Sequence, residues 1–252
     1  MTDSHADKPG NPTDSTDVCA IFGQIAPRYD LTNRILSLGI DRAWRKRAVR
    51  EMRPLSGRRI LDMCCGTGDL AFAFASEGAQ VVACDLSPRM IEMARAKKRP
   101  LHAKHKQPPA AIEWRICDCT ATDLQAQSFD VVSCAFGVRN MADLTAGINE
   151  MYRLLRPGGR ACILEFSLPP NPLIRAAYLA HFRWIMPPLA GLIAGRTAPY
   201  RYLRDSVLHW HRNVDLPQLL CAAGFSDIHA LPLTFGITTL HLAARPADTH
   251  SS

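Results

Sequence analysis

A short glycine loop carries the clearest chemical signal of the chain. The segment LDMCCGTGDL, residues 61–70, places Gly66, Thr67 and Gly68 directly after an apolar run, and Ala71 follows three positions later. This is a loose form of the pattern that opens nucleotide-binding loops. The loop lacks the Lys-Ser/Thr pair with which a P-loop holds phosphates. The glycines alone therefore do not choose among nucleotide cofactors.

Three aspartates around the loop narrow the choice. Asp62 stands just before it, and Asp85 and Asp118 end the next two apolar runs. Each alone is equally a helix cap or turn former, and the spacing to Asp85 also suits the ribose of NAD. Three carboxylates, however, repel a pyrophosphate and attract the sulfonium and ammonium charges of S-adenosylmethionine. We expect Asp62 to meet the amino-acid end of that cofactor and Asp85 its ribose hydroxyls. Asp118, with Cys119 beside it, is expected to face the adenine.

Alternating patterns predict the elements that position these residues. Apolar runs at 58–64, 79–85, 111–118, 129–136 and 160–167 predict buried strands, and 69–78, 87–99 and 143–155 predict helices, with a turn at 156–159. Ser87 and Pro88 are typical of a helix start. Strands that alternate with helices indicate a parallel sheet covered on both faces. Ligands bind such sheets beyond the carboxyl ends of the strands, where the three aspartates fall.

Composition indicates one folded α/β domain. The chain has 252 residues, 47% of them hydrophobic and 21% charged. Residues 1–20 hold four Asp and one Lys, which gives this segment a net charge of −3, whereas the whole chain has a net charge of +7. This composition predicts a disordered acidic leader. Nine scattered cysteines without a C-x-x-C pair argue against a zinc ribbon, so no metal is expected. A cytoplasmic protein with buried free thiols is the interpretation.

The basic residues are concentrated in one stretch: Arg42, Arg45, Lys46, Arg47, Arg50, Arg53, Arg58 and Arg59. A solvated helix face, a nucleic-acid surface and an anionic membrane surface all fit this pattern. Just before it, Tyr29, Asn33 and Ser37 recur at helical spacing and form a polar stripe. Such a stripe suits the head group of an amphiphile, although a plain surface helix has the same pattern.

Residues 168–205 fit no strand or helix of the core alternation. They include WIMPPLAGLIAG, residues 184–195, which has no charge and contains two prolines. This run is shorter than the ~20 apolar residues that cross a bilayer. It predicts a lid over an apolar ligand or shallow membrane contact, with a helical insertion as the alternative.

Longer motifs resemble one family. YDLTNRILSLGIDRAW (29–44), RLLRPGGRACILEFS (153–167), FGVRN (136–140) and YRYLRDSV (200–207) resemble segments of the ubiquinone/menaquinone biosynthesis C-methyltransferases. The likeness covers residues 20–245. It implies a Rossmann-like class I methyltransferase with a seven-stranded, mostly parallel sheet whose last strand is antiparallel, and an N-terminal helical cap. The expected organisation is a leader (1–20), one domain (21–246) with a lid (168–205), and a disordered tail (247–252).

Some positions depart from the family pattern. Thr32 and Asp41 stand where methionine and histidine are usual, and Cys64 and Cys65 replace small residues. Asp118 stands where asparagine is common, and either side chain accepts a hydrogen bond from an adenine amino group. Ala135 replaces a serine that touches the cofactor in some members, so that contact is not carried over.

The resemblance implies methyl transfer from S-adenosylmethionine to a polyprenyl quinol ring, chiefly demethylmenaquinol to menaquinol. The alternative substrate is 2-methoxy-6-polyprenyl-1,4-benzoquinol. Arg139 is the expected cation for a ring oxyanion, with Asn140 and Tyr200 as further catalytic candidates. Tyr29, Asn33 and Tyr202 are expected to bind the quinol. The general base is open among Asp143, Glu165 and water.

Three other classes fit less well. A nucleic-acid methyltransferase would suit the basic body, but the chain has Ala-Phe-Gly-Val where adenine-N6 enzymes carry an Asn/Asp-Pro-Pro-aromatic motif. Nothing suggests the hydride-transfer site of an NAD-dependent oxidoreductase, and a silent binding module would show no cofactor turnover. We therefore expect a cytoplasmic enzyme at the inner face of the membrane, in transient contact with its surface, with no nucleic-acid partner and with a homodimer as one option.

Overall fold

The computed structural model describes residues 37, 39–97, 111–185, 188 and 198–248, without the side chains of 185 and 198–201. Its sheet has seven strands: β1 (Arg59–Met63), β2 (Gln80–Asp85), β3 (Glu113–Ile116), β4 (Phe129–Ala135), β5 (Leu155–Phe166), β6 (Ser226–Leu233) and β7 (Thr238–Ala244). The described α-helices are α2 (Ile40–Glu51), α3 (Asp69–Ala75), α4 (Pro88–Ala96), α5 (Leu144–Leu154), α6 (Pro172–Ala180), α8 (Ala198–Asn213) and α9 (Leu216–Ala222).

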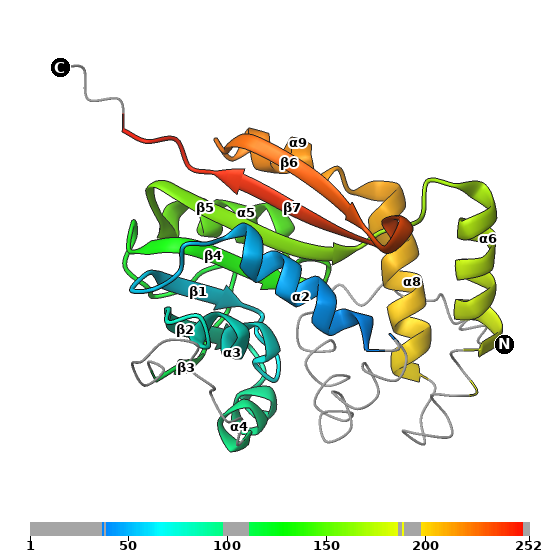
Figure 1. Cartoon of the computed structure of the whole chain (residues 1–252), viewed down its shortest axis with the longest axis horizontal. Helices are drawn as coiled ribbons and strands as arrows, with labels where there is room; N and C mark the ends of the chain where they lie inside the picture. The colour runs from blue at the N-terminus through cyan, green and yellow to red at the C-terminus, as the bar shows by residue number, and fades with distance from the viewer. Residues whose placement is uncertain (1–36, 38, 98–110, 186–187, 189–197, 249–252) are drawn as a thin grey trace, which may run out of the picture.

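The strand order is β3-β2-β1-β4-β5-β7-β6 (Figure 1). β1 to β5 pair in parallel, and β7 runs antiparallel to both of its neighbours. The predicted fold class, a mostly parallel seven-stranded sheet with an antiparallel last strand, is confirmed. The order reverses between β1 and β4, and such a switch point is where open α/β sheets bind ligands.

Alternate residues of the central strands pack into two hydrophobic cores, one on each face of the sheet. Ile60 and Leu61, neighbours on β1, are both fully buried but belong to opposite faces of the sheet. One core contains Trp44 of α2 and Phe74 of α3, and the other contains Met151 of α5. Figure 1 shows α2 in front of the sheet and α5 and α9 behind it. Both faces are covered, as a buried parallel sheet requires.

The expected turn at 156–159 is instead the start of a strand. β5 begins at Leu155, which pairs with Phe129, and the pairing then shifts register before Arg160 pairs with Val131. Gly158 has φ +75°, a conformation that glycine adopts without steric cost. The prolyl-glycine segment is therefore an irregularity within β5, and the prediction of a separate turn was wrong.

Two elements extend beyond the carboxyl ends of β4 and β5. α6 and α8 stand beside that edge of the sheet (Figure 1), and a π-helical turn, His181–Ile185, follows α6. These helices occupy much of the 168–205 segment expected to be a lid, and its closing role stays a prediction. Within the described part of the chain, no helix has the length and apolar character needed to cross a membrane.

Candidate active site

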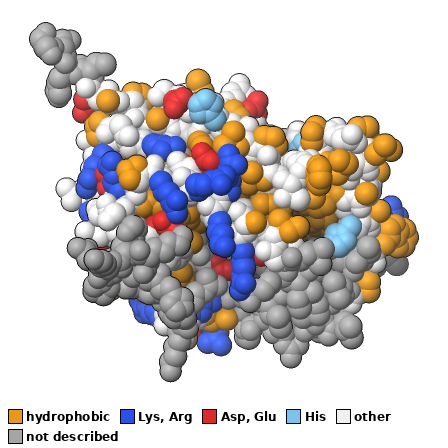
Figure 2. Space-filling view, in the orientation of Figure 1, with side chains coloured by type: hydrophobic (Ala, Val, Ile, Leu, Met, Phe, Trp, Pro, Cys, Tyr) orange, Lys and Arg blue, Asp and Glu red, His pale blue; other side chains and the backbone are white. Residues whose placement is uncertain are grey.

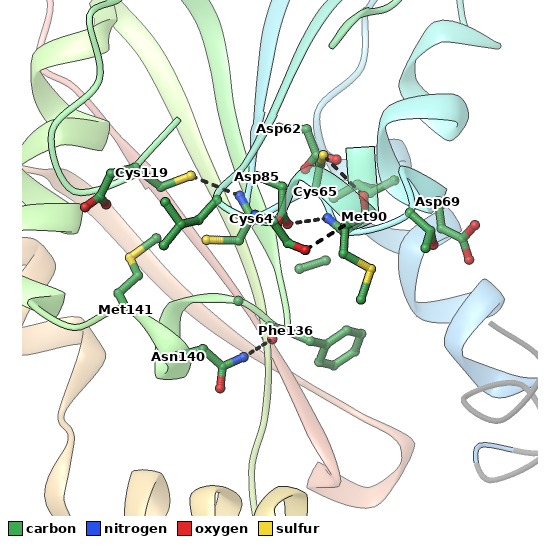
Figure 3. A pocket seen from close by; sticks show the side chains of 18 of the residues that line it. Asp62, Cys64, Cys65, Asp69, Asp85, Met90, Cys119, Phe136, Asn140 and Met141 are labelled. Carbon is green, nitrogen blue, oxygen red and sulfur yellow. Dashed lines mark hydrogen bonds between the residues drawn. The ribbon is translucent and has the colours of Figure 1, made fainter. Parts of the chain in front are cut away.

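A pocket opens at the carboxyl ends of β1, β2, β3 and β4, beside the switch point (Figure 3). The glycine loop forms one wall, and the segment after β4 forms another. Its lining residues are Asp41, Arg45, Asp62, Cys64, Cys65, Gly66, Thr67, Asp69, Leu70, Asp85, Leu86, Ser87, Met90, Asp118, Cys119, Thr120, Ala135, Phe136, Gly137, Asn140, Met141 and Ala142. Charged residues of this pocket are mostly acidic.

Backbone geometry explains the glycines of the loop. Gly66 and Gly68 have φ +55° and +81°, and Gly68 caps the start of α3. A Cβ atom on Gly68 would clash with the Trp114 ring, whose Cζ3 atom would lie 2.8 Å away. A Cβ atom on Gly66 would meet nothing within 4 Å, so its backbone is open to close approach by a ligand.

Asp85 ties the loop to the end of β2. Its two carboxylate oxygens accept hydrogen bonds from Gly66 N at 2.7 Å and Ser87 N at 2.9 Å. Burial raises the pKa of this carboxyl, and the two N–H donors oppose that shift. Each oxygen has a second lone pair, so the carboxylate can also accept from a ligand hydroxyl. The structure thus places Asp85 in the pocket with a structural task as well.

Asp62 is almost completely buried at the end of β1. Its Oδ1 accepts a hydrogen bond from Ser133 Oγ at 2.9 Å. Its Oδ2 is buried and accepts no hydrogen bond within the described residues, although the Ala71 N–H is near enough to lower the pKa of the carboxyl. Burial raises the pKa of Asp62 to about 7, against the opposing effects of the Ser133 hydroxyl and the Arg45 charge. A buried, unpartnered carboxylate oxygen is costly unless a ligand supplies a donor.

The third wall comes from the segment after β3. Asp118 Oδ1 accepts hydrogen bonds from both the backbone N and the Oγ1 of Thr120, at 2.8 and 2.7 Å. Cys119 is buried, and its Sγ accepts from Cys64 N at 3.3 Å. These contacts connect the β3 end to the glycine loop, and both predicted residues line the pocket.

The segment after β4 holds a buried ion pair. Arg139 Nη1 lies 2.7 Å from Glu165 Oε1 on β5, and the two side chains are 4% and 0% exposed. Arg139 Nη1 also donates to the Phe136 carbonyl at 2.6 Å. Burial raises the pKa of Glu165, while the Arg139 charge lowers it. Phe136 itself has φ +62°, a strained conformation of the kind that gathers at functional sites.

Next to this pair, two predicted residues meet. Tyr202 of α8 donates a hydrogen bond from its hydroxyl to Asn140 Oδ1 at 2.8 Å. Burial raises the pKa of Tyr202, and the Arg139 charge lowers it. Tyr178 of α6 is close enough for Arg139 to lower its pKa as well, against burial. Polar groups from four elements thus lie together beside the segment after β4, where Asn140 lines the pocket.

The predicted site residues have different outcomes. Those that line the pocket are Asp62, Gly66, Thr67, Asp85, Asp118, Cys119 and Asn140. Gly68, which caps α3 next to the Trp114 ring, and Arg139, which pairs with Glu165, do not line the pocket. Tyr29 and Asn33 lie outside the described residues, and so does the side chain of Tyr200. The eight described cysteines are free, with Cys64 and Cys65 half-buried.

The structure adds site residues that the sequence did not indicate. Asp41 and Arg45 lie one helical turn apart on α2 and both line the pocket. Their helical spacing was visible, but Arg45 was grouped with the surface basic cluster. No pattern in the sequence indicates Tyr178, because its position near the site depends on how α6 packs in the folded chain. No group of three His, Cys, Asp or Glu side chains in the described ranges is placed to hold a metal ion.

Comparison with protein families agrees with this geometry. The model of the ubiE/COQ5 methyltransferase family matches residues 11–245, nearly the whole chain. The chain belongs to the ubiE/COQ5 methyltransferase family. The resemblance predicted from the motifs is therefore confirmed, and the enzyme is a methyltransferase.

Members of this family with curated names are similar over most of their length. A demethylmenaquinone methyltransferase of Thermus thermophilus is 41% identical over 228 residues, covering 90% of this chain and 100% of that protein. A ubiquinone/menaquinone biosynthesis C-methyltransferase of Syntrophotalea carbinolica is 39% identical, covering 92% of this chain and 96% of that protein.

A solved structure shares the fold of this ubiE/COQ5 family member. Magnesium protoporphyrin IX methyltransferase from Synechocystis, solved with bound SAH, has a TM-score of 0.58 and 21% identity. The match covers 92% of this chain and 99% of that one. At that identity the likeness supports the fold alone.

Proposed function

We propose that the enzyme transfers a methyl group from S-adenosylmethionine to a ring carbon of demethylmenaquinol, giving menaquinol. Membership of the ubiE/COQ5 methyltransferase family and the name of the Thermus relative support the reaction. The observation that carries the proposal is the pocket itself, where Asp62, Asp85 and Asp118 line the carboxyl ends of three neighbouring strands. This set of charges suits a cationic nucleoside.

The residues fit S-adenosylmethionine on two structural grounds. Asp62 Oδ2 is a buried acceptor without a partner in the described chain, which suits an ammonium donor. The backbone at Gly66 is open, which suits a close-packed nucleoside. Asp85 would hold the ribose hydroxyls, and Asp118 and Cys119 would border the adenine. When bound, the cofactor supplies a methyl group already activated by its sulfonium charge.

The chain's own residues then have to make the ring carbon nucleophilic. A quinol ring gains electron density at the carbon next to a hydroxyl when that hydroxyl gives its proton to a base, for which Asp143, Glu165 and water are the candidates. The ring carbon would then take the methyl group as the methyl–sulfur bond breaks, and would release its own proton. Asn140, which lines the pocket, and Tyr202, which is hydrogen-bonded to it, would orient a ring oxygen there. Arg139, oriented by its ion pair with Glu165, would favour the ring oxyanion beside them by hydrogen bonding.

A benzoquinol is the second candidate acceptor. The name of the Syntrophotalea relative covers both ubiquinone and menaquinone biosynthesis. Both rings present a hydroxyl next to an open carbon, so the same residues serve either. The choice depends on the width of the ring site.

We also propose transient contact with an anionic membrane surface, where a polyprenyl quinol dissolves. Arg42, Lys46 and Arg50 are exposed on α2, and Figure 2 shows basic side chains gathered over this helix. Leu173 and Trp184, at the two ends of the α6 region, are 80% and 69% exposed. Basic residues near an anionic surface contribute about 1 kcal/mol each. A homodimer stays a prediction.

The test of the reaction is a methyl-transfer assay. The full chain is incubated with S-adenosylmethionine labelled in its methyl group and with either a short-tailed demethylmenaquinol or 2-methoxy-6-prenyl-1,4-benzoquinol, and the quinones are analysed by mass spectrometry. We expect label on the ring carbon of the naphthoquinol. Label only on the benzoquinol would show that the benzoquinol, not the naphthoquinol, is the substrate. Label on neither quinol would overturn the proposal.

Membrane contact has a separate test. Anionic vesicles should sediment part of the protein at low salt and less at high salt, because the Debye length falls from about 10 Å at 0.1 M to about 3 Å at 1 M. Charge reversal of Arg42, Lys46 and Arg50 to Glu should remove the effect while leaving turnover of a short-tailed quinol unchanged. Equal sedimentation of both proteins would overturn the membrane proposal.

A further inference from the structure

Two buried atoms of opposite charge lack partners in the same pocket. Arg45 Nε on α2 and Asp62 Oδ2 at the end of β1 are both buried, and neither has a hydrogen-bond partner among the described residues. Both residues line the pocket. Buried polar atoms in native proteins are nearly always bonded, and exceptions point to a missing ligand or water. Arg45 Nε is a hydrogen-bond donor and Asp62 Oδ2 is an acceptor. A ligand that carries both a carboxylate and an ammonium group would satisfy the two atoms together.

Arg45 is held in place by its neighbours on the helix. Its Nη1 lies 2.7 Å from Asp41 Oδ2, and Asp41 Oδ1 accepts a hydrogen bond from Ser37 Oγ at 3.0 Å. The guanidinium carbon lies 5.4 Å from the centre of the Phe136 ring, which also lines the pocket. One edge of the guanidinium is therefore fixed by Asp41, and its Nε atom remains available.

The charges of the pocket explain why an arginine is needed there. Arg45 is the single basic residue among the described residues that line it, whereas Asp41, Asp62, Asp69, Asp85 and Asp118 are acidic. An adenosyl ligand with an amino-acid end brings an ammonium and a carboxylate on one carbon. The ammonium suits the aspartates, but the carboxylate would be repelled by all of them unless a cation stood against it.

We propose that Arg45, positioned by Asp41, binds the α-carboxylate of the cofactor's amino-acid end opposite Asp62. The arginine thereby selects cofactors that keep their carboxylate. This inference rests on the proposed function, because it assigns a residue to the same cofactor. It also explains the aspartate at position 41: an acidic side chain there orients the guanidinium, and its charge is used in that pair.

The test compares two ligands that differ only in the carboxylate. Affinities of the full chain for S-adenosylmethionine and decarboxylated S-adenosylmethionine are measured by titration calorimetry, for the unchanged protein, Arg45→Gln and Arg45→Lys. Arg42→Gln, an exposed position on the same helix, is the matched control. Thermal unfolding of each variant checks the fold.

We expect Arg45→Gln to weaken S-adenosylmethionine binding at least tenfold and to leave the decarboxylated ligand unchanged or bound more tightly. Arg45→Lys should retain part of the preference, and Arg42→Gln all of it. If Arg45→Gln and Arg45→Lys weaken the binding of both ligands equally, or do not weaken it, the inference about Arg45 is overturned while the proposed function stands. If the unchanged protein binds neither adenosyl ligand, the proposed function fails instead.

Discussion

The two ends of the pocket are built by different interactions. At the glycine loop, where we propose that the cofactor binds (the cofactor end), two carboxylates accept hydrogen bonds from backbone N–H groups: Asp85 from Gly66 and Ser87, and Asp118 from Thr120. Beside the segment after β4, where we propose that the quinol ring binds (the ring end), side chains from separate elements bind one another: Arg139 pairs with Glu165, and Tyr202 with Asn140. A site built on backbone tolerates changes in surrounding side chains. A site built from side chains depends on each partner, so the ring end should be the more sensitive to single substitutions.

The largest expected effect comes from breaking the buried pair at the ring end. Glu165→Ala leaves the Arg139 charge buried without its partner, which costs about 3–5 kcal/mol of folding stability. Urea denaturation measures the loss. The matched control is Glu92→Ala, which removes an exposed pair with Arg89 and should cost less than about 1 kcal/mol. Similar losses in the two variants would mean that the ring end does not depend on its buried pair.

At the cofactor end, we expect substitutions that strain the backbone to reduce stability most. Gly68→Ala forces a side chain into a positive-φ position against the Trp114 ring, and we expect a loss of about 2–4 kcal/mol. Gly158→Ala has a similar φ of +75° but open space around it, so only the conformational cost of about 1–2 kcal/mol should appear. Thermal unfolding of both variants separates packing from strain. A Gly68 variant no less stable than the Gly158 variant contradicts the packing argument.

A pH series tests the charge at the cofactor end. Burial raises the pKa of Asp62 from 3.8 to about 7, so the folded protein keeps a proton there that the unfolded chain has lost. Stability of the unliganded protein therefore falls as pH rises between these values, by about 1.4 kcal/mol per unit at most. Binding of a ligand ammonium needs the ionised form, so S-adenosylhomocysteine affinity should rise about tenfold from pH 6 to pH 8.

The two controls for this series remove either the Asp62 carboxyl or the amino-acid end of the ligand. Asp62→Asn should give a flat affinity profile, and 5′-methylthioadenosine, which lacks the amino-acid end, should bind without this pH dependence. A rise with pH that persists in Asp62→Asn would assign the effect to another group.

The smallest effect concerns the contact between Asn140 and Tyr202. Tyr202→Phe removes one hydrogen bond and should cost about 1 kcal/mol of stability. If this contact orients the quinol, KM for the quinol should rise while S-adenosylmethionine affinity stays constant. Steady-state kinetics with each substrate varied in turn make the comparison. Weakened cofactor binding with an unchanged KM for the quinol would mean that Asn140 and Tyr202 act on the cofactor and not on the quinol.

The same contrast explains what the sequence could predict. The cofactor end follows from local patterns, because Asp62, the glycines and Asp85 occur at strand ends that hydrophobic alternation already indicates. The number of strands and the antiparallel last strand came from the family resemblance. Arg45 was missed because a basic residue on a helix looks the same from sequence whether it faces solvent or a pocket. The pairing of Arg139 with Glu165 was missed for a related reason, since it depends on how two neighbouring strands end.

Calorimetry on Asp85→Ala tests the central claim most directly. If Asp85 holds the ribose hydroxyls, the loss of charge-assisted hydrogen bonds worth about 1.5–3 kcal/mol each should weaken S-adenosylmethionine binding well over tenfold, with the fold retained by circular dichroism. Asp123→Ala, at a nearby exposed carboxylate, should bind as the unchanged protein does. Unchanged affinity in the folded Asp85 variant, or tighter binding of NAD than of S-adenosylmethionine by the unchanged protein, would contradict the account.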